Sequence, residues 1–377
     1  MKVSLIQENL AKALLYINKA VSSRPNIPIL SNVLLETEKG KLKLSATNLD
    51  IGISTWIGAT IAEEGKVTVS ARMLSDFVNS LKKGKIDLLQ QNQTLVVKSV
   101  DNIAEFYIIP AEDFPRVPQI EGDPLLEINS ELLASTITKT AFAASNDESR
   151  PVLTGLLFKG QKKKLTIVGV DGFRLSKKEI ALEADLGSKD FEEIVPARAV
   201  SEVESLVKDM SGKDDKVQIY LLGNKNQMLF KIGDVELSTR LIEGKFPEYE
   251  NILPKDHKIE FKANKADFSD MLKVASIFAR NVVGNKTKYT VSGSDAKLKL
   301  STTVIDIGNN ESEISIKEIE GEDFETAYNV KFLQDMINTV SGEILIFQTN
   351  GPTAPGVFID PKDKDFIHVI MPMRIEY

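Results

Sequence analysis

A helix-forming phrase occurs three times in this chain of 377 residues, and no other feature constrains its fold as strongly. The copies span residues 69–84, 195–212 and 328–342. Apolar residues recur within them at helical spacing, as at Leu74 and Val78 in the first copy. A Ser, Pro or Asn stands at each start and a Gly at each end, which is the chemistry of helix caps. We therefore predict one type of helix in three consecutive units of the chain.

A basic residue recurs two positions after each of these starts, as Arg72, Arg198 and Lys331. The helix dipole favours acidic side chains in a first turn, so a repeated cation there is mildly unfavourable for the helix itself. Either the three cations coincide by chance on a solvated face, or they contact a shared partner outside the chain.

The repeat extends beyond this helix to whole thirds of the chain. Each third opens with a short strand and a first helix, and we predict these helices at 8–21, 130–144 and 265–282. Alternating strands, the repeated helix and further strands follow in each third. This order predicts an α+β fold of three tandem copies of one domain, each with two helices packed on antiparallel sheets.

Two proline-containing seams, at 114–118 and 246–254, separate the thirds. Proline stops strands and stiffens linkers, so domain boundaries are expected there. The chain is also too long for one ordinary core. We predict domains at residues 1–122, 123–253 and 254–377.

The composition argues against several classes of function. The chain has no cysteine and only two histidines, so disulfides, thiolate catalysis, cysteine-ligated zinc, histidine metal clusters and a Ser-His-Asp triad are not expected. It also lacks the Gly-x-x-x-x-Gly-Lys-Ser/Thr loop that nucleotide hydrolysis commonly uses. Carboxylate pairs such as Glu63 and Glu64 stand in expected turns. We therefore predict no enzymatic activity, no cofactor and no metal site.

Neither a signal peptide nor an apolar run of membrane-spanning length is evident in the sequence. Together with the missing cysteines this predicts a cytoplasmic protein without a membrane partner. The net charge of -7 would by itself repel a polyanion such as DNA, but it does not say where the charges lie.

Five short segments, by their order and spacing, resemble those of one known family. They are Arg-Pro-Asn-Ile-Pro-Ile-Leu at 24–30 and the segments at 110–115, 170–175, 244–249 and 369–375. From end to end the chain resembles the bacterial sliding clamps, the beta subunits of DNA polymerase III. The resemblance implies a DNA clamp fold and a head-to-tail homodimer that closes into a ring. It also implies a processivity factor that encircles duplex DNA without regard to sequence and catalyses nothing itself.

A closed ring is held on DNA by topology, so weak and dispersed cationic contacts suit it better than a tight site. The family's matching arginine touches DNA, which makes Arg24 the first candidate, and Arg150 lies in the analogous loop of the second third. The predicted DNA contacts are Arg24, Lys12, Lys19, Arg72, Arg150, Arg198, Lys208 and Lys331. Further cations on the expected helices are Lys82, Lys83, Lys139, Lys265, Lys273 and Arg280. Each of them, taken alone, is also compatible with an ordinary solvated surface.

The resemblance also implies an apolar groove between the second and third domains. In the family this groove holds short peptide motifs of the replicative polymerase, the clamp loader and repair proteins. Methionines suit such a surface because their flexible side chains adapt to different ligands. Val170 and Phe173 stand where the family often has Thr and His, so a more apolar groove is expected here. Its predicted lining is Leu153, Val170, Gly172, Phe173, Arg174, Leu175, Pro247, Ile252, Val369, Met371, Pro372, Met373 and Arg374; the alternative is that these residues form a core at a domain boundary.

The subunit interface implied by the resemblance pairs the strand around Phe106 with Ile277 and Phe278 of the partner copy. The last two could equally pack inside their own domain. Two other classes of protein remain as rivals: an enzyme with an acid–base site, and a repeat scaffold that binds only proteins.

Overall fold

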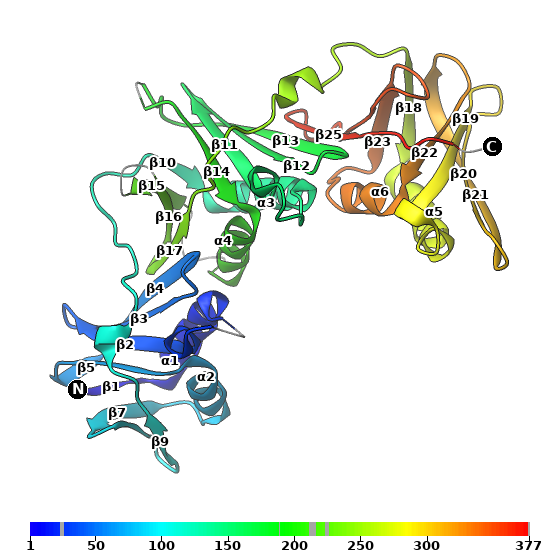
Figure 1. The fold of residues 1–377 in the computed structure, drawn as a ribbon. Helices are drawn as coiled ribbons and strands as arrows, with labels where there is room; N and C mark the ends of the chain where they lie inside the picture. The colour runs from blue at the N-terminus through cyan, green and yellow to red at the C-terminus, as the bar shows by residue number, and fades with distance from the viewer. Residues whose placement is uncertain (23–25, 188, 211–215, 223–225, 376–377) are drawn as a thin grey trace. The chain divides into compact units, whose positions relative to one another are not determined.

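The computed structural model of the chain describes residues 1–22, 26–187, 189–210, 216–222 and 226–375 (Figure 1). Within these ranges the chain forms six α-helices, two in each third. They are α1 (Gln7–Ile17), α2 (Ala71–Ser80), α3 (Ser130–Thr140), α4 (Ala197–Met210), α5 (Lys265–Ala279) and α6 (Val330–Ile337). Helices α2, α4 and α6 are the helix predicted from the repeated phrase.

The predicted caps are present at two of the repeated helices. At α2, the Ser70 side chain accepts a hydrogen bond from the Met73 backbone N–H at 3.5 Å. At α6, the Asn329 Oδ1 atom accepts from the Lys331 N–H at 2.9 Å. These bonds satisfy N–H groups that have no partner inside the helix, and so they fix where each helix begins.

The first helices of the thirds are shorter than their apolar patterns predict. Helix α1 ends at Ile17 and continues as a 3-10 turn, Asn18–Ala20. Helix α3 ends at Thr140 and continues in the same way over Ala141–Ala143. A 3-10 turn keeps apolar side chains at near-helical spacing, so the sequence pattern does not separate it from the α-helix before it.

The strands form three antiparallel sheets. The first has the order β5 (Thr60–Glu63), β1 (Lys2–Ile6), β7 (Lys85–Gln91), β8 (Thr94–Lys98), β9 (Ile103–Tyr107). The second has the order β10 (Leu126–Asn129), β15 (Lys216–Leu222), β16 (Gln227–Ile232), β17 (Val235–Arg240), β4 (Ile51–Gly58), β3 (Lys41–Thr47), β2 (Asn32–Glu38), β6 (Lys66–Ser70).

The third sheet contains twelve strands. Its order is β14 (Phe191–Pro196), β11 (Gly155–Gln161), β12 (Lys164–Val170), β13 (Arg174–Ala181), β25 (Phe366–Ile370), β24 (Gly356–Ile359), β23 (Ile344–Thr349), β18 (Ile259–Asn264), β21 (Gly308–Glu320), β20 (Lys297–Val304), β19 (Lys286–Ser292), β22 (Phe324–Asn329).

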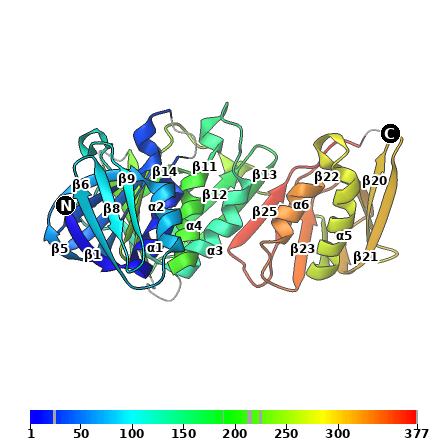
Figure 2. The ribbon, with the colours of Figure 1, turned by 90° about the horizontal axis from the view of Figure 1, so that it is seen from below.

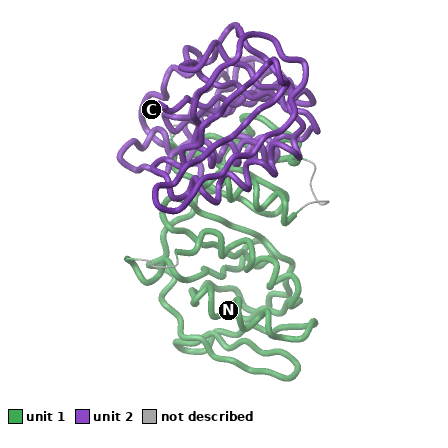
Figure 3. Tube along the Cα trace, turned by 90° about the vertical axis from the view of Figure 1, so that its right-hand side faces the viewer, with its two compact units in different colours: residues 1–134, 198–241 green, residues 135–197, 242–377 purple. Residues whose placement is uncertain are grey.

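The backbone divides into two compact units (Figure 3). Unit 1 comprises residues 1–134 and 198–241, and unit 2 comprises residues 135–197 and 242–377. The middle third contributes strands to both units, because β10 and β15–β17 belong to unit 1 whereas β11–β14 belong to unit 2. The boundaries at 122 and 253 stay a prediction.

Each seam between consecutive thirds is crossed by a pair of strands. In unit 1, β17 pairs with β4, and Leu237 lies opposite Ile53. In unit 2, β13 pairs with β25, and Ser176 lies opposite His368. The sheets therefore continue from one repeat into the next through backbone hydrogen bonds, with no break at the proline seams.

Both units bury apolar helix faces against their sheets. Helix α1 contacts α2 in unit 1 and α5 contacts α6 in unit 2 (Figure 2). In unit 2 the side chains of Phe268 and Leu272 on α5 and of Leu333 on α6 are buried in one core with aromatic residues of the sheet. No helix in the described part of the chain is long and apolar enough to cross a membrane.

Candidate functional site

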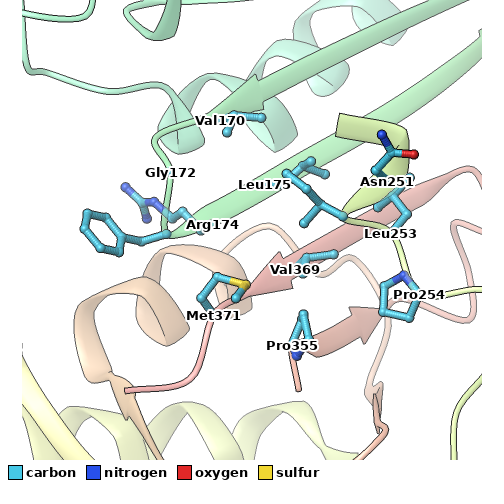
Figure 4. A pocket seen from close by; sticks show the side chains of 12 residues that line it. Val170, Gly172, Arg174, Leu175, Asn251, Leu253, Pro254, Pro355, Val369 and Met371 are labelled. Atoms are coloured by element: carbon cyan, nitrogen blue, oxygen red, sulfur yellow. The ribbon is translucent and has the colours of Figure 1, made fainter. Parts of the chain in front are cut away.

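An apolar cavity of about 490 Å³ opens in unit 2 at one end of the β13–β25 strand pair (Figure 4). Val170, Leu175 and Val369 are consecutive partners across three neighbouring strands, and all three are buried. The complete lining is Val170, Gly172, Phe173, Arg174, Leu175, Asn251, Ile252, Leu253, Pro254, Pro355, Val369 and Met371. A cavity with these walls favours an apolar ligand with few polar contacts.

A tight turn between β12 and β13 forms the rim of this cavity. The Asp171 Oδ1 atom accepts hydrogen bonds from the backbone N–H groups of Phe173 and Arg174, at 2.8 and 2.9 Å. Gly172 takes a φ of +94°, a conformation that residues with a side chain rarely adopt. The turn leaves the Phe173 side chain 60% exposed, while the Phe173 carbonyl accepts the Met371 N–H at 2.8 Å. Phe173 and Met371 therefore lie next to each other at the opening.

Arg174 lines the cavity, but its charge is already compensated. Its Nε donates to Asp171 Oδ2 at 2.9 Å, and its Nη1 donates to Asp335 Oδ2 on α6 at 2.6 Å. The guanidinium also lies over the rings of Phe332 and Phe142, with distances to the ring centroids of 4.3 and 5.3 Å. Only 10% of the side chain is exposed, so the arginine connects the rim of the cavity to α6.

The cavity brings together eight of the thirteen residues predicted to line a peptide groove. They are Val170, Gly172, Phe173, Arg174, Leu175, Ile252, Val369 and Met371. Leu153 is buried and packs in one core cluster with Val170 and Leu175, and Pro247 is not part of the lining.

The other three predicted residues, Pro372, Met373 and Arg374, line a second cavity of about 530 Å³ in unit 2. The Met373 N–H donates to the Ala327 carbonyl at 2.7 Å, which ties this end of the chain to β22. Met371 therefore lines the first cavity, whereas the three residues after it line the second.

Sequence reasoning missed four lining residues: Asn251, Leu253, Pro254 and Pro355. The first three belong to the proline seam at 246–254, and a seam beside a groove is a usable signal for lining residues. Pro355 gave no such signal, because it reaches the cavity only through the pairing of β24 with β25.

The predicted DNA contacts differ in how far their charges are already engaged. Lys19 donates to Ser205 Oγ at 2.6 Å and lies 3.0 Å from Asp209 Oδ2. Lys208 pairs with Glu204 at 2.6 Å. Arg150 lies 3.6 Å from Asp147 Oδ2, and the Lys12 ammonium lies 5.9 Å from the Tyr16 ring centroid. Arg24 lies outside the described residues.

The recurring cations Arg72, Arg198 and Lys331 have a different environment. Each is the second residue of its helix, and each is exposed. Within the described ranges none of the three side chains forms an ion pair. Their charges are therefore available to a partner outside the chain.

The residues predicted for a subunit interface lie on two apolar surfaces. Phe106 belongs to β9, the edge strand of its sheet, and packs edge-on against Phe77 with the ring centroids 5.7 Å apart. On α5, Ile277 is 52% exposed, so about half of its side chain is open to solvent, and Phe278 is half-buried. Ile305 and Ile307, at the β20–β21 turn, are also exposed.

His368 lies on β25 beneath the cavity and is fully buried. Its Nδ1 is 2.6 Å from the Ser176 Oγ atom, and its ring lies 5.2 Å from that of Phe142. Burial, with a smaller effect from the Arg174 charge, lowers the pKa of His368 to about 3. The imidazole therefore stays neutral in the folded protein at neutral and mildly acidic pH.

This shift predicts how stability depends on pH. The unfolded chain protonates the His368 imidazole near pH 6.5, whereas the folded protein does not until about pH 3, so stability falls as the pH decreases between these values. From pH 7 to pH 5 the protein is expected to lose about 2 kcal/mol more unfolding free energy than the His368→Gln variant. Urea denaturation at both pH values measures the difference, and equal losses would show that His368 titrates normally.

Within the part of the chain that the structure describes, no group of three or more acidic or histidine side chains could hold a metal ion.

Three tandem units of two helices and antiparallel strands, with sheets that run across the seams, define a DNA clamp. Three models of the DNA polymerase III beta subunit match in chain order: the N-terminal domain over residues 1–118, the central domain over 127–248 and the C-terminal domain over 250–374. The chain therefore belongs to the DNA polymerase III beta subunit family, the bacterial sliding clamps.

Relatives and solved structures agree with this assignment. The chain is 29% identical to the beta sliding clamp of Synechocystis sp. over 394 residues, with all of both chains covered. It is 27% identical to that of Bacillus subtilis, covering 99% of this chain and all of the relative. The crystal structure of the Bacillus subtilis clamp matches with a TM-score of 0.93 at 26% identity, and that of the Pseudomonas aeruginosa subunit with 0.91 at 27%, both over the full chains.

The predicted fold class, family and function are thereby confirmed. The protein is a DNA sliding clamp, a processivity factor that binds DNA and tethers polymerase partners, and it is not an enzyme. A dimeric ring is typical of the family.

Proposed function

We propose that the cavity at the β13–β25 pair is where this clamp holds short apolar peptide segments of its polymerase, clamp loader and repair partners. The observation that carries the proposal is the continuity between a buried apolar floor, Val170, Leu175 and Val369, and an exposed apolar rim, Phe173 and Met371. A peptide side chain on this floor would bury apolar surface without leaving a protein charge unpaired, because Arg174 already has two carboxylate partners.

A related clamp supports a ligand-binding role for the fold. The sliding clamp of Pseudomonas aeruginosa, 27% identical over the full chain, has been crystallised bound to griselimycin. The second cavity, with Pro372, Met373 and Arg374, belongs to the same proposal as a place where a longer peptide continues along the end of the chain. Because bacterial DNA lies in the cytoplasm, we propose that this clamp works there.

For the ring we propose that the β9 edge of one copy meets α5 and the β20–β21 turn of the other. Phe106 on the first surface, and Ile277 and Phe278 on the second, provide the apolar contacts. Both surfaces expose large apolar side chains, and Tyr107 on β9 is 88% exposed. A second copy would remove this surface from water and cover an open strand edge.

DNA contacts are proposed for Lys12, Arg24, Arg72, Arg150, Arg198 and Lys331. Lys19 and Lys208 were predicted as contacts too, but each already pairs with a carboxylate, as Arg150 does with Asp147, so we expect these three residues to contribute less to DNA binding. Contacts of this dispersed kind let a ring slide, because no phosphate is held tightly.

Retention on DNA of defined topology tests the clamp function. Loaded with a clamp loader, the protein is expected to remain on nicked circular DNA through gel filtration and to leave when the circle is cut. A scaffold that binds only proteins would not be retained on either DNA, and a protein that grips the duplex directly would stay on both.

The interface is tested with one added charge. Ile277→Asp is expected to shift the protein from dimer to monomer at micromolar concentration in sedimentation velocity, because the new carboxylate would be buried without a partner. Val283→Asp, an equally charged change at an exposed residue just beyond α5, is expected to leave the dimer intact. A dimeric Ile277→Asp protein would refute this interface.

A further inference from the structure

Asp335 on α6 pairs with Arg174 at the edge of the apolar cavity, although Asp335 itself lies outside the described lining of that cavity. Its Oδ2 atom accepts a hydrogen bond from Arg174 Nη1 at 2.6 Å. The Asp335 side chain is 30% exposed, whereas that of Arg174 is only 10% exposed. A carboxylate in this place acts on the cavity only through the arginine that it holds.

Two aromatic rings complete the surroundings of the Arg174 guanidinium. Phe332 stands three positions before Asp335 on α6, so both side chains lie on the same side of the helix. The guanidinium carbon is 4.3 Å from the centroid of the Phe332 ring and 5.3 Å from that of Phe142. In Figure 4 the Arg174 side chain points away from Leu175 on the floor of the cavity. The charge is therefore held against α6 and away from the apolar floor.

The same arginine is tied to the rim of the cavity. Arg174 Nε donates to Asp171 Oδ2 at 2.9 Å, and the Oδ1 atom of Asp171 accepts from the N–H groups of Phe173 and Arg174. The Phe173 carbonyl in turn accepts the Met371 N–H. One carboxylate thus fixes both the rim turn and the orientation of the guanidinium, so a displacement of Arg174 would disturb the rim as well.

The first seam of the chain contains the same turn without this ion pair. In unit 1, Asn48 Oδ1 accepts from the N–H groups of Asp50 and Ile51, at 3.1 and 2.8 Å. The Arg240 N–H donates to the Asp50 carbonyl at 3.2 Å. These bonds correspond one by one to those of the turn between β12 and β13, but Ile51 stands in the place of Arg174. The turn therefore forms without an arginine, and the ion pair is not needed to fold it.

The floor also differs between the two seams. In the β4–β17 pair, Gly52 lies opposite Ser238. The corresponding residues of the second seam are Leu175 and Val369. A Cβ atom on Gly52 would lie 2.9 Å from Val117 Cγ1, so a side chain of the same unit fills this space in the first seam. The buried ion pair thus occurs at the seam with an open apolar cavity, and burying two charges contributes little to stability by itself.

We propose that Asp335 is a positioning residue of the peptide-binding cavity. It holds the Arg174 guanidinium against Phe332, which keeps the apolar floor free and gives the rim turn one conformation before a peptide binds. An arrangement that is fixed in advance lowers the conformational entropy lost on binding. The inference rests on the proposed peptide-binding function, and it assigns a part in that site to helix α6 of the third repeat.

Peptide affinity of Asp335 variants tests the proposal. Asp335→Ala removes the acceptor for Arg174 Nη1 and is expected to weaken the binding of a labelled polymerase tail peptide about tenfold in fluorescence anisotropy titrations. Asp335→Asn keeps an oxygen acceptor of the same shape, so its affinity is expected to return to within about threefold of that of the unmodified protein. An unchanged affinity of Asp335→Ala would refute the positioning role.

The Arg174→Met background separates positioning from any direct effect of α6. Methionine leaves no guanidinium for Asp335 to hold, so Asp335→Ala is expected to change the affinity of this variant by less than about twofold. A tenfold loss that persists in the Arg174→Met background would also overturn the proposal, because the carboxylate would then act without the arginine.

The matched control is Asp76→Ala. Asp76 is the sixth residue of α2, as Asp335 is of α6, and it is exposed. The control is expected to bind the peptide like the unmodified protein, and equal far-ultraviolet circular dichroism shows that both variants fold. If the peptide bound elsewhere, Met371→Lys at the opening of the cavity would also leave the affinity unchanged. A loss with Met371→Lys but not with Asp335→Ala would therefore refute the positioning role alone.

Discussion

Replacing Met371 by lysine is expected to weaken the binding of a polymerase tail peptide by at least about 100-fold. Met371 lies at the opening of the apolar cavity, where its N–H bonds the Phe173 carbonyl. An ammonium here would have to lose water when the peptide binds. Arg174 already pairs with Asp171 and Asp335, so within the described lining no carboxylate remains to pair with the new ammonium group.

Isothermal titration with the peptide measures this effect. The matched control is Met73→Lys, the same change at an exposed methionine on α2 in unit 1, and its affinity should equal that of the unmodified protein. Comparable far-ultraviolet circular dichroism for both variants shows that folding is unaffected. An unchanged affinity of Met371→Lys would mean that the peptide binds elsewhere.

The second large effect is expected at a buried charge cluster in unit 2. The Lys139 and Lys178 side chains are 10% and 9% exposed, and both ammonium groups bond the carboxylate of Asp363. Lys139 also lies over the Phe366 ring. Because its ammonium group is engaged in these contacts, Lys139 is no longer a candidate among the helix cations for contact with DNA. Asp363→Ala leaves two ammonium groups without their partner and is expected to lower the unfolding free energy by about 3–5 kcal/mol.

Denaturant unfolding of Asp363→Ala measures this loss. Asp365→Ala changes an exposed carboxylate of the same loop and is expected to cost less than about 1 kcal/mol. Burial raises the pKa of Asp363, but the hydrogen bonds from Lys139 and Lys178 outweigh it, so the pKa lies below the ordinary value. The contribution of Asp363 is therefore complete above the ordinary carboxylate pKa and is lost as the pH falls through the lowered one. Similar losses in both variants would show that the cluster contributes little.

The sequence predicts those parts of the fold that depend on local patterns. The spacing of Leu74 and Val78 predicted α2, and the caps at Ser70 and Asn329 followed from residue type alone. The family resemblance then supplied eight residues of the cavity. What was missed depends on contacts between distant residues, such as Pro355, which reaches the cavity only through the β24–β25 pair.

The partners of charged side chains are even harder to predict from the sequence. In sequence, Lys19 and Lys331 are both cations at predicted helices. In the structure the first bonds Ser205, which is 186 positions away, and the second faces solvent. A local pattern gives the position of a charge along a helix, whereas its partner is fixed by tertiary packing.

The strand pairs that cross the seams determine how such a ring would respond to tension. Separating one repeat from the next at β4–β17 or β13–β25 requires several backbone hydrogen bonds to rupture together. In the interface proposed above, side chains such as Ile277 make the contact between two copies, and they can separate one after another. When a clamp loader opens the ring, we therefore expect the interface between protomers to separate while the strand pairs within each chain stay intact.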